Sequence, residues 1–213
     1  MDSSFLHRRI HSITGIIPVG LFLVYHLYLQ FYLHSGASEY NERVNSFYDS
    51  PLAVWILILF VYLPLLYHSI LGLRLSVEAH VQPQYQYFAH ALYWLQRVSG
   101  VGVFLFMLGH LWNAKLVPAL AEGGMLCLTE CANDHYGHLV TGFGDPETGL
   151  VTKAVYVLGV FGATFHLANG INTFCMTWGI ALTSKGQFRV RIFSMLIFLL
   201  LSASTFYALS ALW

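Results

Sequence analysis

Five apolar runs, each long enough to cross a lipid bilayer, occupy most of this 213-residue sequence. They cover roughly residues 10–33, 51–77, 92–117, 150–178 and 190–212. A helix needs about 20 apolar residues to cross the hydrocarbon layer, and an open sheet would leave backbone groups unsatisfied there. We therefore predict an all-α integral membrane protein, a five-helix transmembrane bundle that forms a single membrane domain over residues 1–213.

The composition agrees with this fold class, because 57% of the residues are hydrophobic and 9% are charged. Soluble domains carry about 25% charged residues. Basic and acidic side chains number ten each, so the net charge does not indicate a nucleic-acid partner. The first run follows Arg8 and Arg9 and exceeds the apolar core of a signal peptide, which has roughly 7–15 residues. We expect it to be retained as the first membrane helix.

The charges in the connecting segments predict the orientation, because cytoplasmic segments carry an excess of Lys and Arg. Seven basic residues fall on the side of the amino terminus and three on the opposite side. The seven are Arg8, Arg9, Arg74, Arg97, Lys185, Arg189 and Arg191, and the three are Arg43, Lys115 and Lys153. We expect a cytoplasmic amino terminus and an external carboxyl terminus. The two faces are called inner and outer accordingly.

Four of the apolar runs contain a histidine: His26, His68, His110 and His166. An ionisable side chain inside a membrane is costly and is usually functional. With a rise of about 1.5 Å per residue, His26 and His110 come near the outer face, and His68 and His166 come nearer the inner face. The histidines thus form an outer pair and an inner pair, each drawn from two helices.

Two histidines on facing helices at one depth are the axial ligands that a six-coordinate haem requires. With both axial positions filled, iron has no free position for oxygen, which favours electron transfer. Small residues lie near the ligands, where a porphyrin would approach a helix: Gly72, Gly109, Gly162, Ala163, Ala168 and Gly170. Close helix packing alone would also explain them. The sequence therefore predicts two haems, one held by His68 and His166 and the other by His26 and His110.

A faint internal repeat accompanies the outer pair. Thr14-Gly15 precedes His26 by about three turns, and Ser99-Gly100 precedes His110 in the same way.

The outer segment Pro118–Gly149 holds a different group of metal-binding residue types: Cys127, Cys131, His135 and His138. These residues suit zinc, but the spacing of the two cysteines is looser than usual zinc motifs. On an oxidising face, a disulfide or no role at all is the favoured interpretation.

Short motifs follow one another along the chain. They are RRIHSITG (8–15), YHL (25–27), LPLLYHSILG (63–72), WLQRVSG (94–100), GHLWN (109–113), FHLANG (165–170) and TWG (177–179). With these motifs, the chain resembles the dihaem cytochrome b subunits of succinate:quinone oxidoreductases, the succinate dehydrogenases and fumarate reductases of respiratory complex II. The resemblance is to the type with one large five-helix anchor, and it covers nearly the whole chain.

The resemblance implies two haems b with the same four ligands. It implies a flavoprotein subunit and an iron–sulfur subunit on the cytoplasmic face, in the cytoplasmic membrane of a bacterium, and leaves higher oligomers open. It also places His11, Ser12 and Trp94 where the propionates of the inner haem are held. Some fumarate-reducing relatives carry a glutamate where this chain has Thr164 and a lysine where it has Thr177. We therefore do not expect a proton route through that glutamate.

We expect this subunit to anchor the complex and to pass electrons between the iron–sulfur subunit and a membrane quinone. Menaquinone is favoured, because a dihaem path is superfluous for a high-potential quinone bound at the inner face. Succinate chemistry itself would belong to a partner subunit, so the chain is expected to be part of an enzyme without a succinate site.

Three other functions compete with this one. One is the dihaem anchor of a formate dehydrogenase or a hydrogenase. Another is a histidine proton relay in a cofactor-free transporter, which predicts staggered histidines and carboxylates inside the spans. No carboxylate lies in the middle of any run, which disfavours the relay. A purely structural anchor would leave four deep histidines unexplained.

Overall fold

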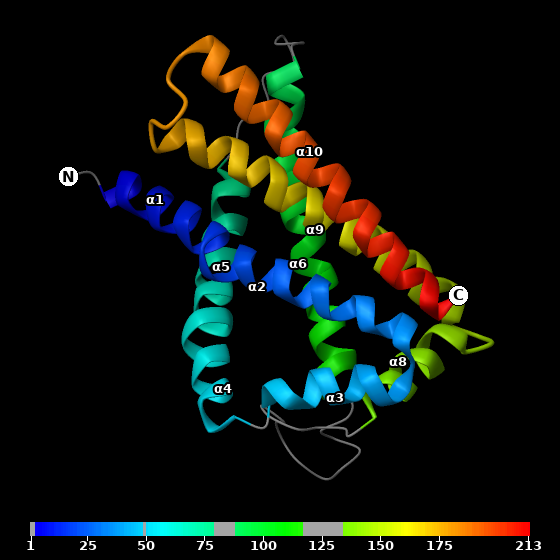
Figure 1. Cartoon of the computed structure of the whole chain (residues 1–213). Helices are drawn as coiled ribbons and strands as arrows, with labels where there is room; N and C mark the ends of the chain where they lie inside the picture. Colours follow the sequence, from blue (N-terminus) through cyan, green and yellow to red (C-terminus); the bar gives the residue numbers. More distant parts are fainter. Residues whose placement is uncertain (1–2, 49, 79–87, 117–133) are drawn as a thin grey trace.

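The computed structural model describes residues 3–48, 50–78, 88–116 and 134–213, and all regular structure among them is helical (Figure 1). The long helices are α1 (Ser3–Ile16), α2 (Pro18–Leu29), α5 (Leu63–Val77), α6 (Phe88–Leu111), α9 (Gly149–Thr177) and α10 (Ser184–Leu209). The shorter ones are α3 (Ala37–Tyr48), α4 (Pro51–Ile56) and α8 (His135–Gly144). Short segments of 3₁₀ or π helix extend several of them: η1 (Gln30–Ser35), η2 (Leu57–Tyr62), η3 (Trp112–Leu116) and η4 (Ser210–Leu212).

Five helical segments are long and apolar enough to cross a membrane. They are Phe5–Ser35, Leu57–Val77, Phe88–Ala114, Gly149–Thr177 and Ser184–Leu212. The predicted all-α fold with five membrane helices is therefore confirmed. The last helix starts earlier than the apolar run, because the Thr183 hydroxyl caps it by accepting the Gly186 N–H at 3.1 Å.

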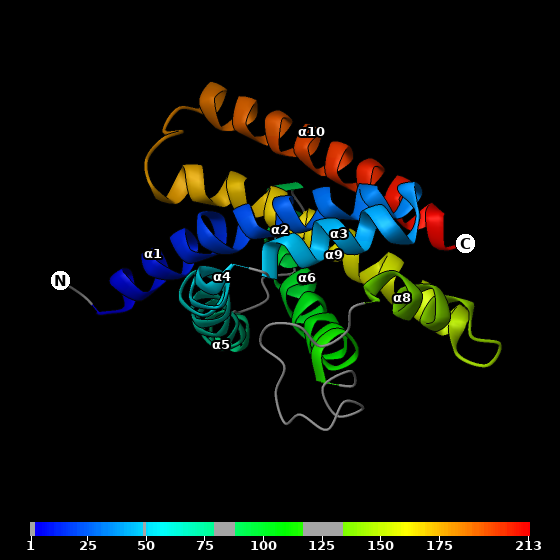
Figure 2. The ribbon, with the colours of Figure 1, turned by 60° about the horizontal axis from the view of Figure 1, so that its bottom comes forward.

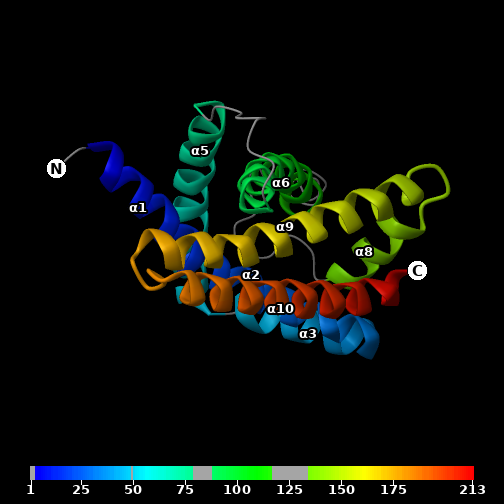
Figure 3. The same ribbon diagram turned by 90° about the horizontal axis from the view of Figure 1, so that it is seen from above.

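Helix α9 lies at the centre of the bundle. It packs against α10 along most of its length, against α6 on another side and against α1 near its carboxyl end. Figures 1 and 3 show α9 and α10 running side by side in opposite directions. Helix α1 also packs against α5, so the carriers of His68 and His166 are joined through α1.

The two prolines inside the apolar runs interrupt regular α-helix. Helix α1 ends at Ile16 and α2 begins at Pro18, because a proline has no N–H for the previous turn and its ring collides with that turn. Near Pro64, the preceding segment Leu57–Tyr62 is π-helical, and the Leu63 N–H bonds the carbonyl of Ile58. Both adjustments lie within two membrane-spanning segments that carry histidines.

Two short helices, α3 and α8, cover the outer end of the bundle and pack on each other (Figures 1 and 2). Their buried sides contribute to an apolar cluster of Leu33, Tyr40, Phe143, Leu209 and Leu212. The Asn41 amide joins the two helices, because it donates to Asp134 at 2.9 Å and accepts the Tyr136 N–H at 2.9 Å.

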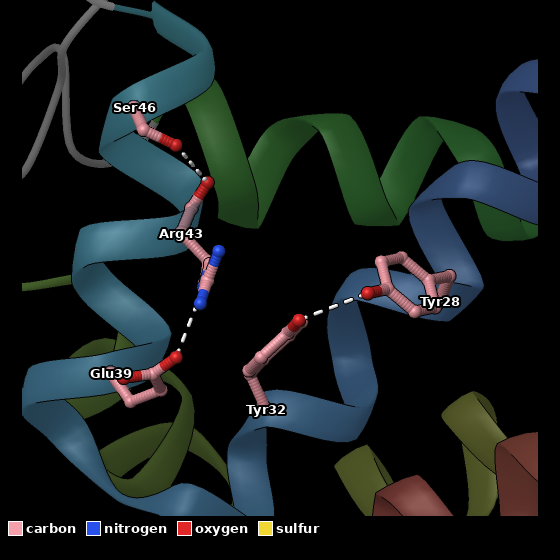
Figure 4. A network of polar contacts seen from close by, with 5 residues as sticks. All are labelled: Tyr28, Tyr32, Glu39, Arg43 and Ser46. Atoms are coloured by element: carbon pink, nitrogen blue, oxygen red, sulfur yellow. Dashed lines mark hydrogen bonds and ion pairs between the residues drawn. The ribbon is translucent and has the colours of Figure 1, made fainter.

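A polar network ties α3 to the end of the first membrane segment (Figure 4). Arg43 pairs with Glu39 at 3.0 Å, and its guanidinium lies 5.0 Å from the centre of the Tyr32 ring. The hydroxyls of Tyr32 and Tyr28 share a hydrogen bond of 2.9 Å. The Ser46 hydroxyl donates to the carbonyl of Arg43 at 3.0 Å.

The stability of helix α8 can be tested through the residue that caps it, Asp134. The Asp134 carboxylate caps it by accepting the Gly137 N–H at 2.8 Å. This bond and the one from Asn41 hold the pKa of Asp134 below its ordinary value. Because the native pKa is the lower one, the cap stabilises fully above the ordinary pKa and is lost as the pH falls through the lowered value. We expect amide hydrogen exchange of residues 135–144 to report this loss of protection in acid.

The matched control is Asp134→Asn, because asparagine also caps a helix but does not titrate there. After correction for intrinsic exchange, its protection should not decrease in acid, whereas Asp134→Ala should lack protection at every pH. Equal acid sensitivity in the wild type and Asp134→Asn would show that the carboxylate is not the cap.

Candidate functional site

The structure brings the four membrane histidines together as two pairs. The ring centroids of His68 on α5 and His166 on α9 are 6.2 Å apart, with the ring planes at 86°. Those of His26 on α2 and His110 on α6 are 5.8 Å apart, with the planes at 75°. The pairs are the ones expected from depth along the sequence. Ligation of a metal by these residues stays a prediction.

The spacing within each pair suits a single metal atom between the two rings. A bond from a metal to an imidazole nitrogen is about 2 Å long, and the ring centroid lies about 1 Å farther away. Two imidazoles on opposite sides of one metal therefore have centroids about 6 Å apart. The observed separations of 6.2 and 5.8 Å agree with this value.

In the inner pair, the second ring nitrogen of each histidine faces a main-chain carbonyl. Nδ1 of His68 lies 2.9 Å from the carbonyl oxygen of His11, and Nδ1 of His166 lies 3.1 Å from that of Gln96. A carbonyl oxygen can only accept, so both Nδ1 atoms carry the proton and both Nε2 atoms keep a free lone pair. Metal-bound histidines are held by partners of this kind.

Gln96 locks α6 to α9 at the inner pair. Its side-chain amide donates to the carbonyl of His166 at 3.1 Å and accepts from the buried Asn169 at 2.8 Å. The hydroxyl of Ser99, one turn farther along α6, lies 3.2 Å from Nδ1 of His166. No role was predicted for Gln96 from the sequence, although it stands in the WLQRVSG motif as a polar amide inside an apolar run.

Glycines let the neighbouring helices approach these imidazoles. A Cβ at Gly15 on α1 would overlap the His68 ring, and one at Gly100 on α6 would lie 2.9 Å from Cε1 of His166. These are the glycines of the internal repeat, which could have indicated them. Of the glycines expected near a porphyrin, Gly72 packs closely, because a Cβ there would lie 3.1 Å from His11, whereas Gly109 faces open space.

The residues expected near the propionates lie at the inner end. The His11 ring stacks on His68 with centroids 4.0 Å apart and planes at 9°. Ser12 is its half-buried neighbour on α1. The Trp94 indole N–H donates to Nε2 of His90 at 3.2 Å. Contact of His11, Ser12 or Trp94 with a propionate stays a prediction.

Buried polar atoms without a hydrogen-bond partner gather, within the described residues, in the inner half of the bundle. They are Arg9 Nε, His11 Nδ1, Tyr67 Oη, Arg97 Nε, Asn172 Oδ1, Trp178 Nε1, Arg191 Nε and Ser194 Oγ. Buried polar atoms are normally bonded, and most of these are donors. The inner end can therefore take up anionic groups such as carboxylates.

Arg9 and Trp178 form the best-defined part of this donor group. The Arg9 guanidinium lies 4.7 Å from the ring centres of both Phe5 and Trp178. It also donates to the carbonyl of Thr177 at the end of α9, at 3.3 Å. Arg9 thus occupies the neighbourhood of Thr177, where some relatives were expected to carry a lysine.

The outer pair has an apolar surrounding. Phe22 stacks on His26 with centroids 5.8 Å apart, and Phe106 stacks on His110 at 5.7 Å. Nδ1 of His110 lies 3.3 Å from the hydroxyl of Tyr156 on α9.

The possible zinc group of the outer segment is only partly described. Cys127 and Cys131 lie outside the described residues. His135 bonds the side chain of Asn45 and His138 bonds the carbonyl of Asn113, both at 3.0 Å. Within the described part of the chain, no three His, Cys, Asp or Glu side chains form a metal-binding group.

Comparison with known proteins identifies relatives of the whole chain. Residues 77–206, more than half of the sequence, match the family of the succinate dehydrogenase/fumarate reductase transmembrane subunit. The chain is also similar to the succinate dehydrogenase cytochrome b558 subunit of Bacillus subtilis (strain 168). The two are 31% identical over 202 residues, which cover 94% of this chain and 93% of that protein.

The glycine contacts yield a matched pair of variants on α6. In Gly100→Ala, the new methyl group should displace the His166 ring, because its carbon would lie 2.9 Å from Cε1. In Gly102→Ala, the methyl group meets nothing within 4 Å. We expect Gly100→Ala to lose or shift the absorbance of one bound haem and Gly102→Ala to retain the wild-type spectrum, measured per mole of purified protein. Identical spectra would show that Gly100 does not determine the position of His166.

Proposed function

The chain belongs to the transmembrane subunits of succinate dehydrogenase and fumarate reductase, and we propose that it conducts electrons through two haems b between an iron–sulfur subunit and a membrane quinone. Membership makes it the membrane-anchoring cytochrome b subunit of a bacterial respiratory complex. We propose in addition that it binds two haems, that four histidines ligate them, and that it reacts with quinone.

The proposal assigns His68 and His166 to the inner haem and His26 and His110 to the outer haem. The observation that carries it is the separation of the two ring pairs, 6.2 and 5.8 Å. When bound, haem would supply reversible one-electron chemistry, and ligation by two histidines would leave its iron without a position for oxygen.

The residues around the inner pair bind and orient. The carbonyls of His11 and Gln96 keep the proton on Nδ1, so that Nε2 of His68 and of His166 would be available to bind the iron. We assign His11, Ser12 and Trp94 to the propionates of the inner haem. Arg9 and Trp178 are further candidates for them, because each has a buried donor without a partner.

The partner subunits are a flavoprotein and an iron–sulfur protein, and we propose that they dock at the inner end. The basic residues expected on that side would steer an acidic surface toward it, with an association rate that falls with salt. Unpartnered donors such as Arg97 Nε and Arg191 Nε lie at the same end and support this assignment.

The outer haem gives a reason to favour menaquinone and a quinone site near the outer face. Oxidation of succinate by a low-potential quinone is unfavourable. Electrons that cross from the negative to the positive side gain about 2.3 kcal/mol per charge per 100 mV, so two electrons gain up to about 4.6 kcal/mol for each 100 mV of membrane potential. A gain of this size could drive the reaction, and a second haem provides the path across the membrane.

The other functions considered from the sequence are weaker. Family membership argues against the anchors of formate dehydrogenases and hydrogenases. A proton relay would require acidic partners within the membrane, but the five spanning segments contain no Asp or Glu. The close pairing of the histidines is also unlike a staggered relay.

Alanine variants of the four histidines test the ligand assignment. We expect the wild-type complex to show two low-spin b-type haems. His68→Ala and His166→Ala should remove the same haem, and His26→Ala and His110→Ala the other, as measured by redox-resolved optical spectra. Loss of one common haem in His26→Ala and His68→Ala would contradict the pairing.

The transmembrane role of the outer pair has a separate test. The assay uses sealed vesicles that hold the whole complex and start with a membrane potential that is positive on the outer side. We expect succinate oxidation with menaquinone to slow after an uncoupler collapses that potential. The same assay with a high-potential quinone is the control. An unchanged rate with menaquinone would show that electrons do not cross the membrane through His26 and His110.

A further inference from the structure

His68, His166 and His110 differ in the group that lies within hydrogen-bond distance of Nδ1. In the inner pair, Nδ1 of His68 and of His166 faces a main-chain carbonyl, at 2.9 and 3.1 Å. In the outer pair, Nδ1 of His110 faces the hydroxyl of Tyr156, at 3.3 Å. The described partner at the outer site is thus a side-chain hydroxyl, whereas each inner histidine faces a main-chain carbonyl, joined at His166 by the Ser99 hydroxyl at 3.2 Å.

The Tyr156 ring is held from several sides. It meets Phe106 of α6 and Phe143 of α8 edge to face, with centroids 5.4 and 4.9 Å apart. Gly159, one turn along α9, admits Phe106, because a Cβ there would overlap the phenyl ring. The His110 ring lies against the same Phe106 and has its centroid 5.9 Å from that of Tyr156. The hydroxyl is therefore fixed relative to Nδ1.

We infer that Tyr156 is a positioning residue of the outer site that orients the His110 imidazole and sets its electron donation. The inference rests on the proposed function, in which His110 binds haem iron through Nε2. Nδ1 then carries the proton and donates it to the Tyr156 oxygen. The phenol cannot act as the donor in this arrangement, because Nδ1 would then be unprotonated and the proton would sit on Nε2.

The hydrogen bond has a predictable effect on the reduction potential of the outer haem. An acceptor on the far nitrogen makes a ligating imidazole a stronger electron donor. Stronger donation stabilises oxidised iron and lowers the potential, one of the means by which a protein tunes haem. Removal of the acceptor should raise the potential of the outer haem and leave that of the inner haem unchanged.

The test is Tyr156→Phe in the purified whole complex, which keeps the ring and its contacts with Phe106 and Phe143. Redox titration followed by optical spectra should show an upward shift of the outer-haem midpoint, with both haems retained. The low-spin electron paramagnetic resonance signal of that haem, which depends on the mutual orientation of the imidazole planes, should shift as well. The matched control is Tyr136→Phe, because Tyr136 packs on the same cluster but lies against Tyr40.

Tyr136→Phe should leave both readouts at wild-type values. An outer-haem midpoint and resonance signal that stay at wild-type values in Tyr156→Phe overturn the inference and leave the proposed function intact. An equal shift in both variants also overturns it, because the effect would then come from the cluster. A separate result would contradict the proposed function itself. In that case, His26→Ala and His110→Ala would not remove the same haem.

Discussion

The four histidines paired in this bundle lie inside membrane-spanning segments, where hydrocarbon in place of water leaves each ring nitrogen in need of a partner from the protein or from a bound group. In the inner half, this requirement joins the helices: α1 provides a carbonyl for His68, and α6 provides one for His166. Each bond requires that two helix backbones come close, and Gly15 and Gly100 allow that approach. The packing of α1 between α5 and α9, and of α6 against α9, is consistent with this single requirement.

The two halves of the bundle meet the requirement for polar partners differently. At the outer end, α3 and α8 cover the apolar cluster, and Asn41 joins them with a donor and an acceptor. At the inner end, described donors such as Arg9 Nε and Trp178 Nε1 are buried without a partner. Among the described residues, the polar groups of Asn41 and Asp134 find partners within the chain, whereas the donors at the inner end are left for groups from outside it, in line with the proposed propionates and partner subunits.

Much of the architecture was predictable because the signals are local. Hydropathy over about 20 residues defines a membrane helix, and depth along each helix was enough to pair His68 with His166 and His26 with His110. The remaining features depend on which helices are neighbours. The sequence of α1 does not indicate that Gly15 faces a histidine of α5. Likewise, the sequence of α6 does not indicate that Gln96 forms hydrogen bonds with α9. The start of α10 at Ser184, where Thr183 caps the helix, was not predictable from hydropathy. The first residues of this helix are polar and precede the apolar run.

The contrast between carbonyl and hydroxyl partners bears on how the two sites can vary among descendants of this protein. Every amino acid except proline brings the same carbonyl without altering the helix, so replacing His11 or Gln96 changes the side chain and retains the atom that holds the proton of the ligand. The described partner of His110 is the side-chain hydroxyl of Tyr156. One nucleotide change can convert this tyrosine to phenylalanine, which lacks the hydroxyl. Natural variation can therefore remove the hydroxyl partner of His110 with one side-chain change, whereas the carbonyl partners of His68 and His166 survive such changes.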